Sequence, residues 1–350
     1  MSIIGGSLLC VLGGVGIGSF LLPLKYSKTW KWENSWLVGA FLMYLVLPLI
    51  TISCVVPQFR EIYELTPAKD LWMIYLFGII QGTGSLVFTY GTSLMGISLG
   101  YALMIGCIAF FSLLIPLFVA HTDRLIKLDG LTLLLGCMIL LIGVAISGRA
   151  GLERERLVTT TAQKAGARRV SALLIIGVVL WAGIANAMFY FTFEFQQSMK
   201  ALAIEQFHVP PYAWGFLNTL PFFLGMFTIN VLLTGAKMVK DGSIKNYWSS
   251  PNLTREYSLA LAIGVIWYLS QGIGYTAAQA MLGPLGVPVG GGLFMGTIII
   301  SSNLLGLYTG EWNHVPPPTM RKLHLALITL IAAVSIIALG NYLQIAFGAT

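Results

Sequence analysis

The feature of this sequence that most constrains its fold is a series of long apolar stretches. Ten of them divide the 350 residues, at 2–24, 35–57, 71–93, 96–120, 129–148, 171–195, 211–234, 257–283, 286–309 and 323–346. A helix of about 20 apolar residues crosses a bilayer, whereas barrel strands would show about ten residues of alternating polarity. No such alternation occurs, and lipid tolerates only helices and closed barrels. The sequence therefore predicts an all-α integral membrane protein with ten transmembrane helices.

The charged residues are few and unevenly placed between these stretches. They make up 9% of the chain, against about 25% in a typical soluble domain. Fifteen of the 20 Lys and Arg residues lie in odd-numbered loops and five in even-numbered loops. Because positive loops stay in the cytoplasm, the odd loops are expected inside and both termini in the periplasm. The net charge of +7 then reflects membrane topology and not nucleic-acid binding.

Two segments of the chain match each other in register, 190 residues apart. Gln81-Gly82-Thr83-Gly84 recurs as Gln271-Gly272-Ile273-Gly274, and the match continues at Gly96/Gly286, Gly100/Gly290, Leu103/Leu293, Gly106/Gly296, Ile108/Ile298, Ser112/Ser302 and Leu114/Leu304. The two copies lie five crossings apart, so the second must cross in the opposite direction. This predicts two inverted five-helix repeats, 1–148 and 171–350, joined by a basic cytoplasmic linker at 149–170.

Sequence motifs for other energy sources and for catalysis are missing. The chain has no Gly-rich phosphate loop and no HExxH, and its mid-span positions carry almost no ionisable groups. We therefore expect a secondary transporter, with no catalytic residues, no metal site and no cofactor.

Three uncharged amide side chains are expected at mid-membrane depth. Gln81 and Gln271 lie on the matched spans, and Asn186 lies in the sixth span between two alanines. Amides offer both donors and acceptors, as the hydroxyls of a neutral sugar require. Each could instead bond across helices, which is common in membrane bundles. Both interpretations remain open at this stage, with the three amides as candidate substrate contacts.

Aromatic residues inside the spans are the second group of candidates. Trp267 and Tyr268 precede Gln271 by four and three residues, so one helix face can carry an aromatic ring and the amide together. Tyr101 and Tyr275 also lie inside spans. Aromatic rings can cover the apolar face of a sugar while a few polar groups bind its hydroxyls. The alternative is an interfacial or lipid-facing position.

Glycine pairs at GxxxG spacing recur in the spans, at Gly14/Gly18, Gly78/Gly82, Gly96/Gly100 and Gly286/Gly290. Small residues at this spacing favour close helix contacts.

Two charged residues lie at the ends of spans. Glu194, near the end of the sixth span, is the candidate for proton coupling, with an interfacial carboxylate as the alternative. Lys25 ends the first span and either snorkels to the interface or lines the inner mouth of a polar pathway.

Several local motifs along the chain carry a family resemblance. They are Pro23-Leu24-Lys25, Trp30-Lys31-Trp32-Glu33-Asn34-Ser35-Trp36, Val38-Gly39, Leu47-Pro48, Gly143-Val144, Arg149-Ala150-Gly151, Trp267-Tyr268-Leu269, Gly306-Leu307 and Glu311-Trp312-Asn313. With them the chain resembles the bacterial L-rhamnose/proton symporter family, within the drug/metabolite transporter superfamily. The resemblance implies ten helices in two inverted halves and uptake of a deoxysugar, with the proton as coupling ion.

The expected function is proton-coupled uptake of L-rhamnose or a similar deoxysugar by alternating access at the bacterial inner membrane. Its expected partners are a small neutral sugar, the proton and membrane lipid, with a monomeric or weakly oligomeric chain. One alternative is a drug/metabolite-type exporter or exchanger of another small polar solute. A passive channel or a non-transporting membrane scaffold is the alternative from another class.

Overall fold

The computed structural model of the protein describes residues 3–95, 97–120, 122–158, 172–282, 286–310, 312–313 and 315–347, and every regular element in them is helical. In this part of the chain, nine helical stretches are long and apolar enough to cross a membrane: Ile4–Leu24, Trp32–Val55, Ala68–Phe88, Leu128–Arg154, Leu173–Gln206, Phe216–Asp241, Leu253–Met281, Val289–Tyr308 and Pro317–Gly340. The remaining predicted span, 96–120, is occupied by helix α6 (Ile97–Ala120). The prediction of an all-helical, multi-pass membrane protein is confirmed.

The backbone packs as two compact units, and each takes segments from both predicted sequence halves. Unit 1 consists of Met1–Thr83 and Phe191–Gly283, and unit 2 of Gly84–Tyr190 and Pro284–Thr350. The first boundary falls inside α5 (Ala68–Met95), in the middle of the Gln81-Gly82-Thr83-Gly84 motif. The next falls inside α10 (Met188–Phe195).

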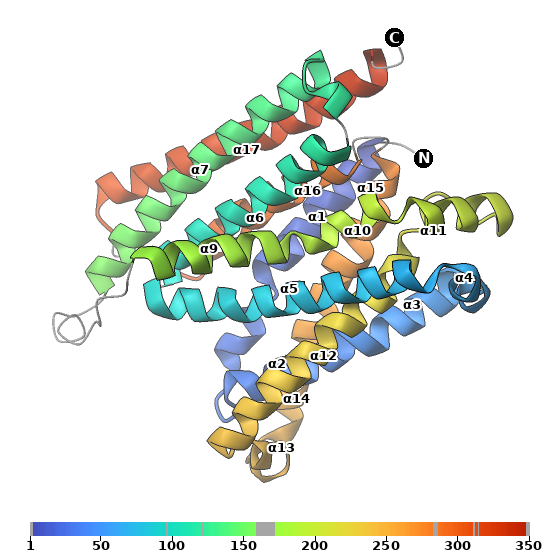
Figure 1. Cartoon of the computed structure of the whole chain (residues 1–350). Helices are drawn as coiled ribbons and strands as arrows, with labels where there is room; N and C mark the ends of the chain where they lie inside the picture. Colours follow the sequence, from blue (N-terminus) through green and yellow to red (C-terminus); the bar gives the residue numbers. More distant parts are fainter. Residues whose placement is uncertain are drawn as a thin grey trace. The chain divides into compact units, whose positions relative to one another are not determined.

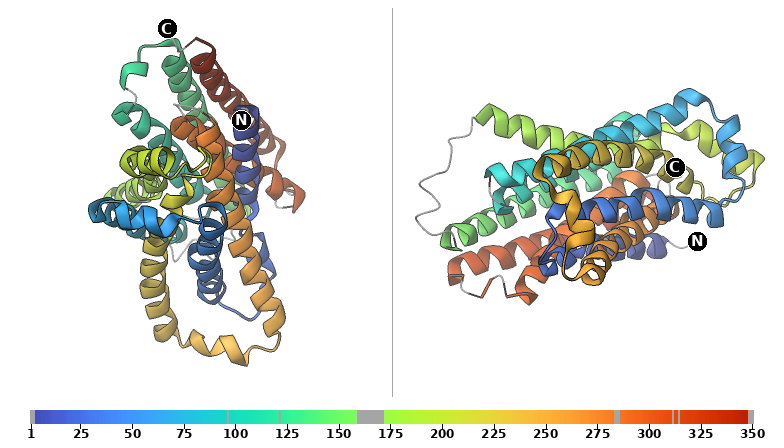
Figure 2. Two further views of the ribbon diagram at one scale, coloured as in Figure 1. Left: turned by 90° about the vertical axis from the view of Figure 1, so that its right-hand side faces the viewer. Right: turned by 90° about the horizontal axis from the view of Figure 1, so that it is seen from below.

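Unit 1 contains two long helical hairpins. The first comprises α1 (Ile3–Ser19), η1 (Leu22–Tyr26), α2 (Trp32–Phe41), η2 (Leu42–Val46), α3 (Leu47–Val55) and α4 (Phe59–Leu65). The second comprises α11 (Gln197–Ala201), η4 (Leu202–Gln206), α12 (Phe216–Asp241), η5 (Ser243–Lys245), α13 (Asn246–Ser249), α14 (Leu253–Trp267), η6 (Tyr268–Tyr275) and α15 (Thr276–Met281). Figure 2 shows α13 crossing between the ends of α12 and α14. Three of these segments, η2, η4 and η6, are π-helical.

Helices α5 and α12 approach each other through glycines within unit 1. A Cβ atom added to Gly78 would lie 1.9 Å from the Phe222 carbonyl oxygen, and one added to Gly82 would lie 2.1 Å from Ile229 Cγ2. These two glycines form one of the GxxxG pairs, so the prediction of a close helix contact is confirmed for this pair.

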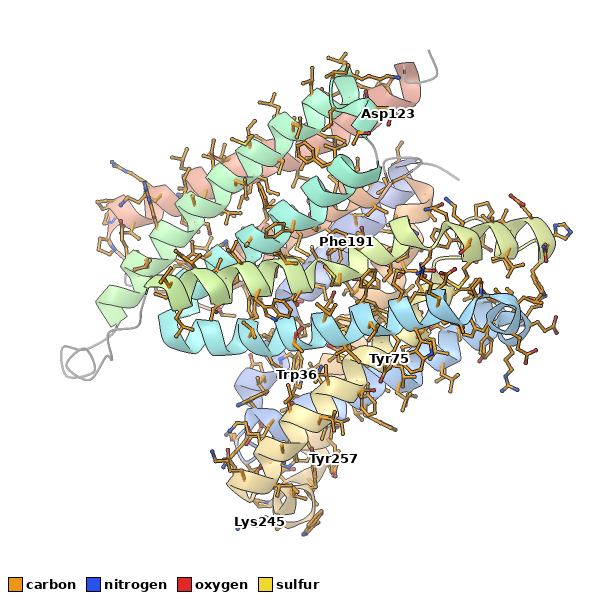
Figure 3. The ribbon with its side chains drawn as sticks, in the orientation of Figure 1. Trp36, Tyr75, Asp123, Phe191, Lys245 and Tyr257 are labelled. Carbon is orange, nitrogen blue, oxygen red and sulfur yellow. The ribbon has the colours of Figure 1, made fainter. Side chains whose placement is uncertain are left out.

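The Trp30–Trp36 motif joins the two hairpins of unit 1 at one end. Trp30 Nε1 donates a hydrogen bond to the Asn246 carbonyl oxygen at 3.1 Å, and Asn34 Nδ2 donates to the Ser243 carbonyl oxygen at 2.9 Å. The Tyr247 hydroxyl donates to the Asn34 carbonyl oxygen at 3.1 Å. Burial raises the pKa of Tyr247 to about 12, so this hydroxyl stays protonated at neutral pH. Figure 3 labels Lys245 and Tyr257 at this end of the unit.

A buried carboxylate strengthens the same connection. Glu256, 1% exposed in the first turn of α14, accepts hydrogen bonds from the backbone N–H groups of Lys28 and Thr29 at 3.0 and 3.1 Å. The hydroxyls of Thr29 and Ser27 also donate to it, at 2.9 and 2.5 Å. Ser27, Lys28 and Thr29 lie in predicted loop 1, between the first two spans, and Glu256 lies in loop 7, between the seventh and eighth spans. Two odd-numbered loops are thereby bonded to each other.

Even-numbered loops meet in unit 1 as well. The Ser198 hydroxyl donates to Asp70 Oδ2 at 2.7 Å, and Gln196 Nε2 donates to the Asp70 carbonyl oxygen at 3.3 Å. These bonds join predicted loops 2 and 6. Helices that alternate direction across a membrane require this pairing of odd with odd loops and even with even loops.

Unit 2 contains α6, η3 (Thr122–Arg124), α7 (Leu128–Val158), α9 (Ala172–Asn186), α16 (Gly286–Tyr308) and α17 (Pro317–Phe347), with the adjoining parts of α5 and α10. Helix α7 continues ten residues past the predicted end of the fifth span, so its last three turns lie in the predicted linker. Helices α7 and α17 run side by side (Figure 1). Near the end of α7, the Arg154 guanidinium lies 4.9 Å from the centre of the ring of Trp312, which precedes α17 in the chain.

One helix contact occurs twice in unit 2, at positions 190 residues apart. A Cβ atom added to Gly106 would lie 2.7 Å from Val144 Cγ1, and one added to Gly296 would lie 2.4 Å from Val334 Cγ2. Both glycines belong to the sequence match, and the two valines are separated by the same interval. The matched glycines therefore have equivalent packing roles in α6 and α16.

Candidate functional site

The second copy of the matched motif lies in a π-helical segment of unit 1. Gln271, Gly272 and Gly274 all belong to η6, which connects α14 to α15. The first copy, at Gln81, lies in the regular α-helix α5. In a π-helical turn the backbone hydrogen bonds join residues five apart instead of four, which makes the helix wider. Such turns are often found at functional sites. The equivalent sequences thus present their glutamines from different helix geometries.

Small residues let neighbouring groups approach η6 closely. A Cβ atom added to Gly16 of α1 would lie 1.9 Å from Ser270 Oγ, so α1 packs directly on this segment. A Cβ atom added to Gly272 would lie 2.4 Å from Cε2 of Tyr268. The Tyr268 ring therefore lies over Gly272, which fixes the direction of the ring.

Four aromatic side chains form an aromatic cluster beside η6: Tyr44, Phe223, Trp267 and Tyr268. The ring centres of Tyr44 and Trp267 are 5.1 Å apart at 90°, and those of Phe223 and Trp267 are 5.4 Å apart. Phe223 also lies 6.2 Å from Tyr268. All four rings are buried. Edge-to-face pairs of this kind hold aromatic rings in fixed positions.

Proline 48 explains why Tyr44 lies in a π-helical turn of its own. Pro48 has no backbone N–H, so it cannot donate to the carbonyl four residues earlier, at Tyr44. The helix takes the wider π-helical form in η2 (Leu42–Val46), just before this proline. The Leu47-Pro48 motif therefore shapes the backbone that carries the Tyr44 ring.

Six buried polar side chains in unit 1 carry atoms without a hydrogen-bond partner in the described part of the chain, and three of them lie at the start of α12, in η6 and in α15. We call Asn218, Tyr268 and Gln279 the unpaired polar cluster. Both amide atoms of Asn218, the Tyr268 hydroxyl and Gln279 Nε2 are unpaired. Asn218 is 0% exposed. Because a buried polar group without a partner costs about 1–3 kcal/mol, these atoms are suited to a bound polar ligand.

Helix α12 and the residue before it place these groups near one another. Gly215, the N-cap of α12, lies so close to α15 that an added Cβ would be 3.1 Å from Gln279 Nε2. Asn218 follows one turn later. The Tyr268 hydroxyl lies close to the hydroxyls of Thr51 and Thr219. One face of α12 therefore borders the polar atoms of both η6 and α15.

The start of α12 is adapted to a proline inside the helix. Pro221 cannot donate to the Leu217 carbonyl oxygen. The Tyr63 hydroxyl donates to that oxygen instead, at 2.7 Å. Burial raises the pKa of Tyr63 well above its usual range, which keeps this hydroxyl a donor.

The structure places four of the predicted contact residues in unit 1. Gln271 and Trp267 are 7% and 8% exposed, and neither the Gln271 amide nor the Trp267 indole makes a hydrogen bond within the described residues. Tyr275 is fully buried, with its ring 6.2 Å from that of Phe193. Gln81 is also buried, at 7% exposed. Trp267, Gln271 and Tyr275 come together along α14 and η6.

Asn186 belongs to unit 2, where its amide connects two helices. Its Oδ1 accepts a hydrogen bond from the Ser85 hydroxyl at 3.1 Å, and its Nδ2 donates to the Ala182 carbonyl oxygen at 2.8 Å. A Cβ atom added to Gly84 would lie 2.9 Å from Nδ2. These contacts supply the interhelical bonding that was one of the two interpretations of this residue.

Three predicted site residues have side chains outside the described part of the structure. Lys25 lies in η1, Tyr101 in α6 and Glu194 in α10, and only their backbone is described.

Sequence reasoning missed Asn218 and Gln279, and it noted Tyr268 only as an aromatic residue next to Trp267, three residues before Gln271. Asn218 is an amide inside an apolar span, the same signal that identified Asn186. Tyr268 directly follows Trp267, and Gln279 lies two turns beyond Gln271. The sequence shows that these polar residues lie within apolar stretches. Only the folded chain shows that their side chains are buried and that some of their polar atoms have no hydrogen-bond partner.

The side chains gathered around η6 are amides, hydroxyls and aromatic rings. Such a set can bind a neutral polyol through hydrogen bonds while its rings cover apolar carbon.

Comparison with known proteins gives a consistent result over nearly the whole chain. A sequence model of the L-rhamnose-proton symport protein family matches residues 1–342. An L-rhamnose-proton symporter of Escherichia coli (strain 55989 / EAEC) is 27% identical over 336 residues, covering 94% of this chain and 96% of the relative. One from Citrobacter koseri is 25% identical over 344 residues, with the same coverage.

Proposed function

Because the chain belongs to the L-rhamnose-proton symport protein family, we propose that it takes up L-rhamnose, or a closely similar deoxysugar, together with protons. The protein is a transporter and not an enzyme. Uptake proceeds by alternating access around a mid-membrane site in the bacterial inner membrane.

One observation carries the proposal beyond family membership. The unpaired polar cluster and the aromatic cluster lie together around η6, in a buried part of unit 1. Neutral donors and acceptors beside aromatic rings fit a sugar that has hydroxyls on one side and apolar carbon on the other. Each sugar hydrogen bond contributes roughly 0.5–1.5 kcal/mol net, so several are needed for useful affinity.

The proposed architecture has ten helices in two inverted five-helix repeats, 1–148 and 171–350, joined by the basic linker 149–170. The repeated contact of Gly106 with Val144 and Gly296 with Val334 supports a structural duplication. The pairing of odd with odd loops supports the alternating directions of the helices. With the basic residues concentrated in odd loops, both termini lie in the periplasm.

The coupling ion in this proposal is the proton, and no other cofactor takes part. Glu194 is the candidate carrier, since a carboxylate in a membrane span readily changes protonation. Lys25 is the candidate for the inner mouth of the pathway. The candidate substrate contacts remain those predicted from the sequence: Gln81, Gln271, Trp267, Tyr101, Asn186 and Tyr275. Membrane lipid surrounds the chain, which acts as a monomer or weak oligomer.

Uptake of labelled L-rhamnose into right-side-out membrane vesicles tests this function. We expect saturable uptake that rises with an inwardly directed proton gradient and stops when a protonophore collapses it. Uptake unaffected by the protonophore would refute proton coupling. High, non-saturating flux would indicate a channel, transport of a different solute in counterflow would indicate an exchanger, and no flux would indicate a scaffold.

A further inference from the structure

We propose that Asn218 and the Tyr268 hydroxyl read the hydroxyl groups of the sugar and so determine substrate specificity. This inference rests on the proposed function. It assigns the hydroxyl recognition to α12 and η6 together, and the apolar part of the sugar to the neighbouring rings.

The first argument is a contrast between two asparagines on the same helix. Asn230 of α12 is fully buried and uses both amide atoms: its Oδ1 accepts from Trp36 Nε1 at 2.9 Å, and its Nδ2 donates to the Met226 carbonyl oxygen at 2.8 Å. Asn218 is equally buried, yet neither of its amide atoms has a partner among the described residues. A structural asparagine on α12 is thus fully bonded, whereas Asn218 has donor and acceptor capacity left for a ligand.

The second argument is the position of Asn218 relative to η6. It lies between Gly215 and Phe222 on one face of α12, since residues three and four apart share a helix face. At Gly215 this face borders Thr276 Cγ2, 3.1 Å from an added Cβ. On the neighbouring face of the same helix, Phe223 lies 6.2 Å from the Tyr268 ring. Asn218 therefore lies one turn beyond the contact of α12 with α15, in the half of α12 that also reaches Tyr268.

The Tyr268 hydroxyl is available in the same region. It is 1% exposed, it lies close to the hydroxyls of Thr51 and Thr219, and it has no partner with full hydrogen-bond geometry among the described residues. Thr219 adjoins Asn218 in sequence and directs its own hydroxyl to the Phe216 carbonyl oxygen at 2.7 Å. The Tyr268 hydroxyl thus retains its own donor and acceptor capacity.

The chemistry of these groups matches a pair of adjacent sugar hydroxyls. The carbonyl oxygen of an amide accepts, its NH₂ donates, and a phenol hydroxyl does either. Two neighbouring hydroxyls on a pyranose ring can therefore bind the amide of Asn218, one as donor and one as acceptor. The group bound is neutral, so no charge is buried.

The aromatic cluster gives the other half of the specificity. Tyr44, Phe223 and Trp267 present buried rings beside Tyr268. The C6 methyl group of L-rhamnose suits such a surface. L-Mannose differs from L-rhamnose only by a hydroxyl on C6, which would lose its water against these rings. The deoxysugar is therefore the preferred substrate.

The main test replaces Asn218 by leucine, which has a similar size and no polar atoms. In purified full-length protein, Asn218→Leu is expected to leave the ligand-free melting temperature unchanged or higher, because an unpaired buried amide has been removed. Its affinity for L-rhamnose should fall at least about tenfold, the loss expected when two hydrogen bonds are removed. The thermal shift induced by L-rhamnose should disappear at concentrations that saturate the wild type.

Asn230→Leu is the matched control on the same helix. It breaks two existing hydrogen bonds, so it should lower the ligand-free melting temperature and leave affinity for L-rhamnose within about twofold of wild type. Asn218→Leu is thus expected to keep or raise the melting temperature and to weaken L-rhamnose binding. Asn230→Leu is expected to lower the melting temperature and to leave L-rhamnose binding nearly unchanged.

A second variant, Tyr268→Phe, removes only the unpaired hydroxyl. We expect an unchanged melting temperature and an affinity for L-rhamnose about three- to tenfold weaker, the loss from one hydrogen bond. Wild-type protein should bind L-mannose more weakly than L-rhamnose.

The inference is overturned if Asn218→Leu melts lower, as Asn230→Leu does, and still binds L-rhamnose as the wild type does. Unchanged rhamnose affinity in Tyr268→Phe would remove Tyr268 from the site. Failure of the wild type itself to bind or transport L-rhamnose would instead refute the proposed function, and it is visible before any variant is made.

Discussion

Gly78 of α5 lies directly against the Phe222 carbonyl oxygen of α12, with only 1.9 Å between that oxygen and the position of an added Cβ. The reciprocal contact occurs one turn away, where a Cβ on Gly225 would lie 2.1 Å from the Tyr75 carbonyl oxygen. Both helices therefore touch backbone to backbone, and neither contact can be relieved by rotating a side chain.

Replacing one of these glycines is expected to disrupt unit 1. Gly225→Ala inserts a methyl group into a space bounded by backbone, so we expect a loss of at least about 2 kcal/mol in the free energy of unfolding. Thermal unfolding in detergent measures the effect. Gly235→Ala is the control on the same helix, because nothing lies within 4 Å of its added Cβ. It should be neutral or stabilising by up to about 1 kcal/mol. Equal effects of the two substitutions would contradict the close contact.

The two carboxylates that connect loops should differ in importance. Glu256 is buried and accepts four hydrogen bonds, and a glutamine there would turn an NH₂ group toward donors. Glu256→Gln is therefore expected to cost about 2–3 kcal/mol in the free energy of unfolding. Glu153 pairs with Lys322 where their side chains are 34% and 45% exposed, so Glu153→Gln should cost less than about 1 kcal/mol. Denaturation in detergent compares the two, and a larger effect at Glu153 would refute this ranking.

The amides of Gln271 and Asn186 should respond in opposite ways to removal of their polar atoms. Gln271→Met removes no hydrogen bond of the described structure, so it should spare stability and weaken L-rhamnose binding about three- to tenfold. Asn186→Leu breaks the bonds to Ser85 and Ala182, so it should lower the free energy of unfolding by about 1–2 kcal/mol. Melting curves with and without L-rhamnose measure both quantities. Loss of stability at Gln271 with unchanged binding would show that its amide is structural.

The hydrogen bond from Tyr63 to Leu217 should depend on Pro221. Tyr63→Phe leaves the Leu217 carbonyl oxygen without a partner, at an expected cost of about 1–2 kcal/mol. In a Pro221→Ala background the new backbone N–H can donate to that oxygen, so the cost of Tyr63→Phe should fall by half or more. A double-mutant cycle of unfolding free energies makes the comparison. Tyr342→Phe, at a side chain 61% exposed, serves as the neutral control. Additive effects of Tyr63→Phe and Pro221→Ala would rule out the substitution of one donor for the other.

The helical class and the approximate spans followed from the apolar stretches, because lipid leaves the backbone few ways to satisfy its hydrogen bonds. The ends of the helices did not follow. Helix α7 continues into the predicted linker, and α12 begins five residues later than predicted. Charged side chains past the membrane boundary are compatible with a helix, so hydropathy alone cannot mark where it stops.

The sequence also determined which positions form close glycine contacts and which residues are polar inside apolar spans. It identified Gln271 and Trp267, which lie together around η6, because mid-span amides and aromatic pairs are visible in one dimension. It could not show that Asn218 is buried without partners while Asn230 on the same helix is fully bonded. That difference depends on Trp36, 194 positions from Asn230 in the chain, and on contacts brought together by folding. The tertiary structure alone decided it, since a hydrogen bond requires two groups to meet in space and the sequence specifies only one of them at a time.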